Sequence, residues 1–362
     1  MLLSRPARLA ISSLATAVVA AGVLTGTAQA KPEPAPSGTD TVATVTDRLA
    51  RQLAGEFAAD AKKLLPTTAD KAVHLADAPR GSALGRAVAA ADRSVLAAKG
   101  LPQDGASLLT VRLADPTMVP ALRRGVAPLV ASSPSDDDAT AVTAYAPGAR
   151  RVTLAADRLP ARPVYLVEID TEAALARGMA VLRSTLSASG VTRADIGTAS
   201  GYWATQVSSI RLNDDMEPWH KGGAEIFAIA AGFGLDSKVK VDTVEMPYLD
   251  NDGTTYYPGQ LLVHFSSYKY NLADLVLMEE DGGTNYRDLA IALAGALLTI
   301  VDGGVYIPLV NAILNAIPND WWVDDPDYVD SFYTLTTATS GTLRGAAGNA
   351  TMTVNPYWVQ PL

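Results

Sequence analysis

Two stretches in the C-terminal half gather oxygen-bearing side chains of the kind that bind a hard cation. Residues 211–227 read RLNDDMEPWHKGGAEIF, and residues 275–288 read LVLMEEDGGTNYRD. In each stretch a β-strand pattern adjoins acidic residues, so both clusters are expected in loops at strand ends. Calcium takes about six to eight oxygen ligands and accepts irregular geometry. Carboxylates held together without such a cation repel one another. The two stretches therefore predict a Ca²⁺ site.

The arrangement resembles the calcium-binding end of a C2-type β-sandwich, over residues 203–358. In that family an acidic first loop leads to a short motif, usually Ser-Asp-Pro-Tyr, that opens the next strand. Residues 224–227, Ala-Glu-Ile-Phe, stand in that place. The family's third loop has an acid-x-acid pattern with another acid further on, and residues 279–288 are similar. The chain departs from the family in a longer first loop, in Glu at two Asp positions and in an apolar helical segment between the last strands.

The resemblance implies metal ligands at individual positions of this chain. The first choices are Asp215, Glu225, Glu279, Asp281 and Asp288, and the second choices are Asp214, Glu217, Glu280 and Asn285. The alternative is that these residues form solvated acidic turns in an acidic protein and bind no metal.

Four phrases along the chain also resemble a family of secreted bacterial proteins of unknown function. They are LTVRLADPTMVPALRRGVAPLVA, ARPVYLVEID, DMEPWHKGGAEIF and DDPDYVDSFYTL. This second resemblance implies export and a two-part architecture, and it implies no activity.

A secreted hydrolase that uses the same acidic cluster is the alternative function. Paired carboxylates serve as acid and base in glycosidases, and the chain offers Glu217, Glu225, Glu279 and Asp281 for those roles. Its three histidines form no HExxH motif, and no GxSxG nucleophile elbow or phosphate-binding glycine loop occurs. His220, within the acidic loop, is the histidine best placed to act as a metal ligand or proton shuttle.

Charge argues against some classes of partner, and composition rules out some types of site. The formal net charge is −9, which disfavours nucleic acid and anionic lipid as simple electrostatic partners. The chain contains no cysteine, so disulfides, thiolate metal sites and a cysteine nucleophile are absent. Stability must then come from the hydrophobic core or from bound metal.

The first 30 residues have the features of a signal peptide. Arg5 and Arg8 precede an apolar run from Leu9 to Leu24, and residues 28–30, Ala-Gln-Ala, match the pattern that signal peptidase cleaves. The alternative is an uncleaved membrane anchor, but the apolar run is short for a bilayer span. Residues 31–40, KPEPAPSGTD, are expected to form a disordered leader.

The remaining sequence predicts an α+β fold in two parts. Residues 41–195 are expected to form an N-terminal α+β domain that begins with helices. One helix should carry Leu49, Leu53, Phe57 and Leu64 on one face and stop at Pro66. The other elements expected are helices at Ala83–Lys99 and Thr171–Ala188, and strands at Leu108–Leu113, Ala141–Tyr145, Arg151–Ala155 and Pro163–Ile169.

Residues 202–362 are expected to form an antiparallel, C2-like β-sandwich, because short β-branched runs alternate with turn signals. The strands are expected at Thr205–Leu212, Ala224–Ala230, Lys238–Glu245, Gln260–His264, Ala273–Met278, Asp330–Thr337 and Ala350–Pro356. Apolar stretches at Leu289–Val301 and Val305–Ile317 predict a helical hairpin inserted at residues 286–317. Each stretch is too short to cross a bilayer, so membrane insertion is not expected.

Together these features favour an exported protein that binds an unknown extracellular or envelope partner with the help of Ca²⁺. The sequence names no substrate and no catalytic residue.

The signal-peptide pattern predicts cleavage after Ala30, so the secreted protein should begin at Lys31. Intact-mass measurement of protein from culture supernatant tests this start. A secreted species that still carries residues 1–30 would contradict it.

Overall fold

The computed structural model describes residues 40–66, 72–134, 139–193, 201–214, 219–251, 253–280, 282–317 and 328–361. The expected signal peptide and nearly all of the leader lie outside these ranges. From Thr39 onward the chain forms one compact unit of helices and largely antiparallel sheets, which confirms the α+β class. Within the described ranges, no helix combines the length and the apolar character that crossing a membrane requires.

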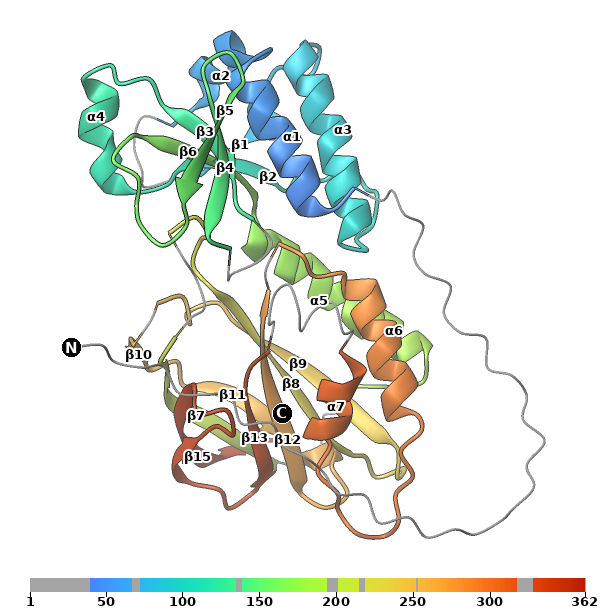
Figure 1. Ribbon diagram of the computed structural model, residues 1–362. Helices are drawn as coiled ribbons and strands as arrows, with labels where there is room; N and C mark the ends of the chain where they lie inside the picture. The colour runs from blue at the N-terminus through green and yellow to red at the C-terminus, as the bar shows by residue number, and fades with distance from the viewer. Residues whose placement is uncertain are drawn as a thin grey trace, which may run out of the picture. The chain divides into compact units, whose positions relative to one another are not determined.

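The N-terminal part is built on a six-stranded sheet in the order β1-β2-β6-β3-β4-β5 (Figure 1). The strands are β1 (Val73–His74), β2 (Leu109–Leu113), β3 (Leu129–Ser132), β4 (Ala141–Ala146), β5 (Arg150–Ala155) and β6 (Val164–Ile169). Neighbours are antiparallel except β3 and β6, which run parallel. Helix α1 (Val42–Ala54) packs on this sheet, and α3 (Ala83–Ala98) packs beside α1. Two shorter helices, α2 (Ala58–Leu64) and α4 (Val119–Arg123), complete this part.

The first helix ends earlier than the sequence predicts. A single helix reaching Pro66 is wrong, because α1 stops at Ala54 and α2 begins at Ala58. Gly55 ends α1, and a Cβ atom there would come within 2.9 Å of the Cβ of Ala149. The turn between β4 and β5 approaches this point, and the amide of Gly148 donates a 2.9 Å hydrogen bond to the carbonyl of Ala54. The Ala54 carbonyl thus accepts a hydrogen bond from the turn, whereas in a continuous helix it would accept one from the amide four residues later.

The C-terminal part contains two antiparallel sheets that share one core. The first, called here the β7 sheet, has the order β10-β7-β15-β14 with β11 also paired to β7. The second, called the β8 sheet, has the order β13-β12-β8-β9. The strands are β7 (Tyr202–Leu212), β8 (Glu225–Phe233), β9 (Val239–Met246), β10 (Thr255–Tyr256), β11 (Gln260–His264), β12 (Leu272–Glu280), β13 (Tyr328–Thr336), β14 (Gly341–Arg344) and β15 (Ala350–Val359). Buried side chains of both sheets, such as Ile210 and Met352 from one and Leu275 from the other, meet between them.

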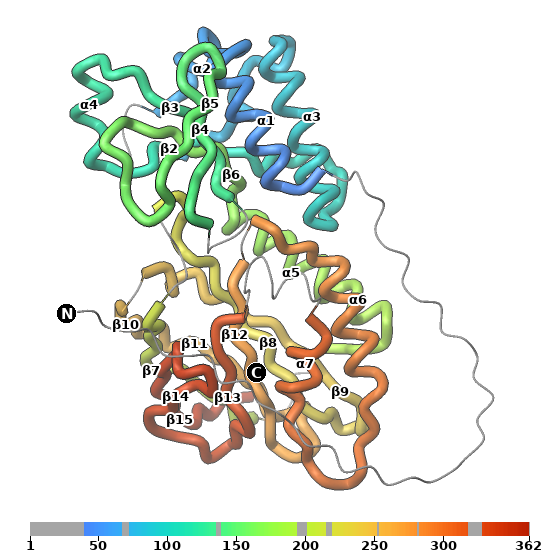
Figure 2. Tube along the Cα trace, viewed as in Figure 1, coloured from blue at the N-terminus to red at the C-terminus, as the bar shows by residue number. Residues whose placement is uncertain are grey.

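The outer face of the β8 sheet is covered by helices. These are α5 (Thr171–Ala188), α6 (Tyr286–Leu297) and α7 (Val310–Ala316), and α5 and α6 lie side by side (Figure 2). Helix α5 precedes the sandwich in sequence but packs on β8 and β9. Its buried side chains belong to the same core as those of α1 and α3, so one hydrophobic core runs through both parts. The expected ranges 41–195 and 202–362 meet near residues 194–200, outside the described residues.

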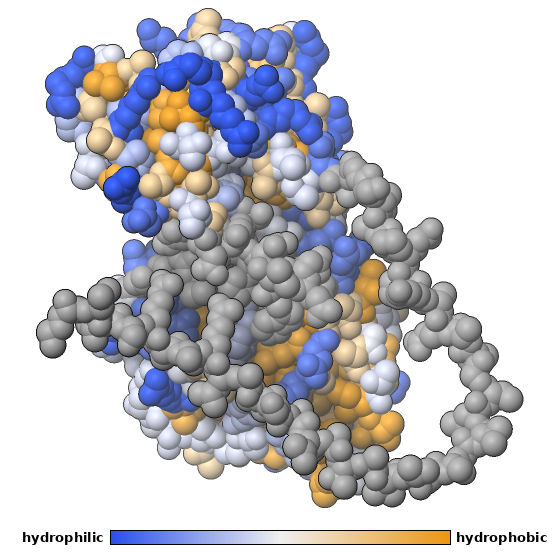
Figure 3. Space-filling view, viewed as in Figure 1, coloured by the Kyte–Doolittle hydropathy of each residue, from blue (hydrophilic) through white to orange (hydrophobic). Residues whose placement is uncertain are grey.

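The helical segment between β12 and β13 exposes apolar side chains. The two expected stretches correspond to α6 and α7, which are shorter than expected and joined by an irregular segment. The exposed aliphatic side chains of this segment are Ile291, Leu298, Val301, Val305 and Ile307. Figure 3 shows apolar surface in the region of these helices.

The contact between α5 and α6 depends on a glycine. Gly178 lies on the buried face of α5, and a Cβ atom at this position would overlap the ring of Tyr286 on α6. Gly178→Ala should therefore destabilise the protein by about 1–3 kcal/mol. Gly295→Ala is the matched control, because Gly295 is exposed in α6 and no atom lies near its Cβ position. The control should stabilise by about 0.5–1 kcal/mol through helix propensity.

Urea unfolding of the two variants measures both effects. Equal stability of Gly178→Ala and wild type would mean that the Tyr286 ring does not pack against α5 as described.

Candidate functional site

One end of the sandwich carries both acidic stretches. Strands β7, β9 and β12 end there and β8 begins there, because neighbouring strands in each sheet are antiparallel. Three connections start or end at this edge: residues 213–224, residues 247–259 and the stretch that follows Glu280. They are called here the first, second and third loops. The structure therefore brings the described residues of the two stretches to one edge of the sheets.

The carboxylates at this edge point in two directions. Glu225 and Glu280 are register partners across β8 and β12, and Glu279 stands opposite Ile226. Successive side chains of a strand alternate between faces. Glu225 and Glu280 therefore face the helices, while Glu279 faces the interior of the sandwich. Glu279 is 5% exposed and Glu280 is fully buried.

A lysine from the N-terminal part reaches Glu280. The Nζ of Lys99 forms an ion pair with Oε1 of Glu280, and the hydroxyl of Tyr286 donates a hydrogen bond to Oε2. Lys99 Nζ also lies 3.4 Å from the carbonyl oxygen of Gly282 and 5.4 Å from the centre of the Tyr286 ring. The side chains of Lys99, Glu280 and Tyr286 have no exposed surface. The three residues form a buried charged cluster.

Two helix ends position this cluster. Lys99 follows the last residue of α3, and Tyr286 is the first residue of α6. The Nδ2 of Asn285 donates to the carbonyl of Ala98 at 2.9 Å, and the amide of Tyr286 donates to the carbonyl of Lys99 at 3.1 Å. The start of α6 thereby supplies donors to carbonyls at the end of α3, which an isolated helix leaves without partners.

The six-stranded sheet holds the first loop through two contacts. Arg112 on β2 pairs with both carboxylate oxygens of Glu168, at 2.8 and 2.9 Å, and its Nη2 donates to the carbonyl of Lys221. Burial raises the pKa of the Glu168 carboxyl, although Arg112 opposes this effect. Ser133 Oγ lies 2.8 Å from Nδ1 of His220, a fully buried residue. His220 is therefore part of the packing between the two parts of the chain.

The predicted ligands that the structure describes differ in how exposed they are. Asp215, Glu217 and Asp281 lie outside the described residues. Asp214 and Asp288 are exposed, and Glu225 is half-buried. The Oδ1 of Asn285 caps α6 by accepting from the amide of Asp288 at 3.1 Å. Among the described residues, no three His, Asp or Glu side chains are grouped closely enough to hold a metal ion.

Sequence reasoning missed Lys99, Tyr286 and Arg112, which contact these loops. Lys99 follows an alanine-rich helix and precedes a glycine, so its surroundings in sequence resemble those of any exposed helix end. Nothing near it in sequence indicates a partner 181 residues away.

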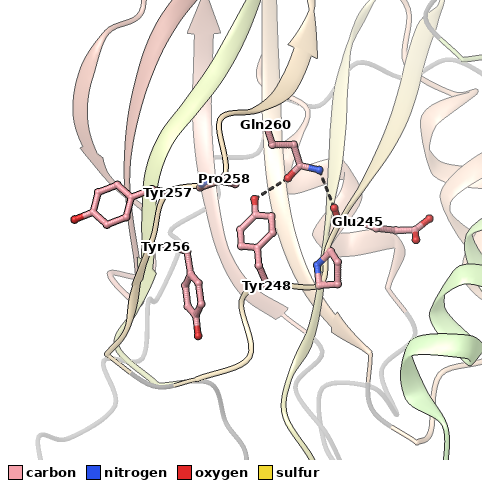
Figure 4. A pocket seen from close by; sticks show the side chains of 7 residues that line it. Glu245, Tyr248, Tyr256, Tyr257, Pro258 and Gln260 are labelled. Atoms are coloured by element: carbon pink, nitrogen blue, oxygen red, sulfur yellow. Dashed lines mark hydrogen bonds between the residues drawn. The ribbon is translucent and has the colours of Figure 1, made fainter.

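An open groove of about 760 Å³ lies along the second loop (Figure 4). Its lining residues are mostly aromatic or cyclic: Glu245, Pro247, Tyr248, Tyr256, Tyr257, Pro258 and Gln260. The rings of Tyr248 and Tyr256 are 6.0 Å apart and tilted by 47°. Tyr257 projects away from them and is 79% exposed. The groove thus offers flat apolar faces to a ligand.

The polar groups of the groove are held by the protein itself. The hydroxyl of Tyr248 donates to Oε1 of Gln260 at 2.6 Å, and Nε2 of Gln260 donates to the carbonyl of Glu245 at 2.9 Å. Burial raises the pKa of Tyr248. The hydroxyl of Tyr256 donates to Asp250 at 2.7 Å, which ties the groove to an acidic residue of the second loop.

The carboxylates around the groove can be compared with those of a glycosidase. Its one lining carboxylate, Glu245, points away from the tyrosines and accepts a 2.9 Å hydrogen bond from Arg183 on α5. A glycosidase needs two carboxyl groups that face each other across the substrate. The lining residues of this groove do not provide that pair.

The comparisons with known proteins name no activity. The profile of one protein family, described as "Protein of unknown function (DUF3103)", matches residues 46–362. No curated protein and no solved structure matches the chain.

Removing the ammonium group of Lys99 should destabilise the fold. Lys99→Met would leave the Glu280 carboxylate buried without its cation, a change that costs about 3–5 kcal/mol in buried ion pairs. The double variant Lys99→Met/Glu280→Gln removes both charges and should recover part of that loss. Lys63→Met is the control, because the Lys63 side chain is 77% exposed.

Urea unfolding of the variants in parallel gives the comparison. If Lys99→Met were as stable as Lys63→Met, the Lys99 side chain would not be buried against Glu280.

Proposed function

The chain belongs to this family of unknown function, and we propose that it is a calcium-dependent binding protein acting on an extracellular or envelope partner. The observation that carries the proposal is the meeting of acidic strand ends and a tyrosine-lined groove at one end of the sandwich. Aromatic faces supply binding area at little cost in conformational entropy. Acidic loops supply the hard oxygen donors that calcium prefers.

The proposed architecture is a C2-like sandwich with an apolar helical insertion. Two antiparallel sheets enclose a common core, and the first and third loops adjoin acidic strand ends at the same edge. These two features support the proposed likeness to C2 domains.

The proposed ion joins the first and third loops on the interior side of the β8 sheet. Glu279 fits this role, because it is the next-to-last residue of β12, faces the sandwich interior and is almost completely buried. Asp215 and Asp281 are the further ligands proposed, since each neighbours a described acidic residue of its loop. Glu280 is engaged by Lys99 and Asn285 caps a helix, so neither belongs to the proposed set.

Glu225 and Asp288 fit the ion less well. Glu225 faces the helical side of the sheet, opposite to Glu279, and Asp288 is exposed on α6. A single ion would not reach all the first-choice residues.

Calcium should raise the melting temperature of the protein. Binding to the folded state adds RT ln(1 + [L]/Kd), about 2.7 kcal/mol at one hundred times Kd. Extracellular sites often have Kd on the order of 10⁻⁴–10⁻³ M, so millimolar calcium should give a modest shift. Magnesium should give less, because it demands smaller octahedral geometry. Thermal unfolding with added Ca²⁺, Mg²⁺ or chelator measures the effect.

Substitutions distinguish carboxylates that bind the metal from carboxylates that only support the fold. Glu279→Gln and Asp281→Asn should lose the calcium shift, and Asp281→Asn should leave the metal-free protein equally stable or slightly more so, since repulsion is relieved. Asp157→Asn, an exposed acid in a turn of the six-stranded sheet, should keep the shift. Absence of any calcium shift in the wild type, or unfolding of Asp281→Asn without metal, would remove the support for this function.

A further inference from the structure

The cluster of Lys99, Glu280 and Tyr286 brings an amine and a carboxyl group together away from water. The two groups are in hydrogen-bonding contact, and neither side chain has exposed surface. We propose that the Nζ of Lys99 and the Cδ of Glu280 are joined by an isopeptide bond, which links α3 covalently to β12.

Burial favours the amide over the ion pair. Removing an ammonium and a carboxylate from water costs much free energy, and their mutual attraction offsets this only in part. An amide carries no net charge and avoids most of that penalty. Apolar packing adds to the effect, because the Tyr286 ring lies directly against the backbone of Gly178.

The folded protein holds the amine and the carboxyl group close together, and this proximity speeds their reaction relative to the same groups free in solution. Well-oriented groups react with effective molarities of about 10⁵–10⁸ M, and near-attack positions have reacting atoms roughly 3–3.5 Å apart. An amine in hydrogen-bonding contact with a carboxylate oxygen lies at about that distance from the carboxyl carbon. The exclusion of solvent from these side chains also protects the product from hydrolysis.

The reaction is a condensation and needs no cofactor. A proton passes from the Lys99 ammonium to the Glu280 carboxylate, which leaves a neutral amine and a carboxylic acid. The amine nitrogen attacks Cδ, and the Nζ–Cδ bond forms as the Cδ–Oε1 bond breaks. Oε1 leaves as water with two of the three ammonium protons, and the nitrogen keeps the third. No atom is oxidised or reduced.

Tyr286 is placed to assist this step. Its hydroxyl donates to Oε2, the oxygen that carries negative charge in the tetrahedral intermediate and becomes the amide carbonyl oxygen. A fixed donor at that oxygen stabilises the transition state. Tyr286 thus contributes to the reaction as well as to packing.

A covalent link at this place suits a chain without cysteine. The bond would join residues 181 positions apart and hold the six-stranded sheet to the sandwich. A disulfide that closes a long loop restricts the unfolded chain in the same way.

Mass spectrometry of the purified, denatured protein tests the bond. The intact wild-type mass should fall below the sequence mass by one water molecule. Trypsin should fail to cut after Lys99, and the peptide of residues 94–112 should be recovered joined to the peptide of residues 270–287. Fragmentation should place the branch at Lys99 and Glu280.

Two variants sharpen the result. Lys99→Arg should have its full sequence mass, because a guanidinium is not a nucleophile. Glu280→Gln should lose ammonia in place of water if its amide reacts in the same position. The wild-type measurement stands even if either variant fails to fold.

Two outcomes would overturn the proposal. One is a folded wild-type protein with its full sequence mass and a normal tryptic cut after Lys99, which would leave a simple ion pair. The other is loss of water without a branched peptide, placed at the Asp281-Gly282 sequence, which would indicate cyclisation of that aspartate.

Discussion

The buried contact between Lys99 and Glu280 is the constraint on which the arrangement of the whole chain depends. It places the end of α3 against the end of β12, and from there Tyr286 begins the helix that covers the β8 sheet. The backbone bonds between α3 and α6 and the approach of α6 to Gly178 follow from this meeting. The six-stranded sheet and the sandwich share one apolar core, and this buried ion pair lies at the place where the two meet.

At the loop end, two acids are held by cationic side chains of the N-terminal part. Lys99 neutralises Glu280, and Arg112 neutralises Glu168 while holding the first loop. Glu279 points to the other side of the strand from Glu280, away from the face that Lys99 occupies. The neighbouring groove has a different character, since its tyrosine hydroxyls and glutamine amide are already hydrogen-bonded within the protein. The acidic strand ends and the tyrosine-lined groove are therefore adjacent but separate surfaces.

Much of the fold could be predicted from local patterns, and the tertiary contacts could not. Helix α5 has the predicted bounds because Asp170 caps it, and β11 matches its prediction. Strand β3 was not predicted, since all four of its residues are buried and show no alternation. Edge strand β14 is short and mostly exposed, so it lacks an apolar signature. At the site, the acidic loops were visible in the sequence, while the position of Lys99 depends on distant packing that leaves no local trace.

The position of α5 has a consequence for the order in which the chain can fold. This helix is synthesised before β8 and β9, the strands that cover its apolar side, and before α6, which packs along it. Until those strands emerge, Leu175, Met179 and Leu182 have no sheet to bury them. Contacts between residues so far apart in sequence form slowly. Apolar surface that stays exposed in the meantime promotes aggregation. A chain that ends before Met246 therefore leaves the apolar side of α5 without its sheet, and α6 completes the cover of this helix.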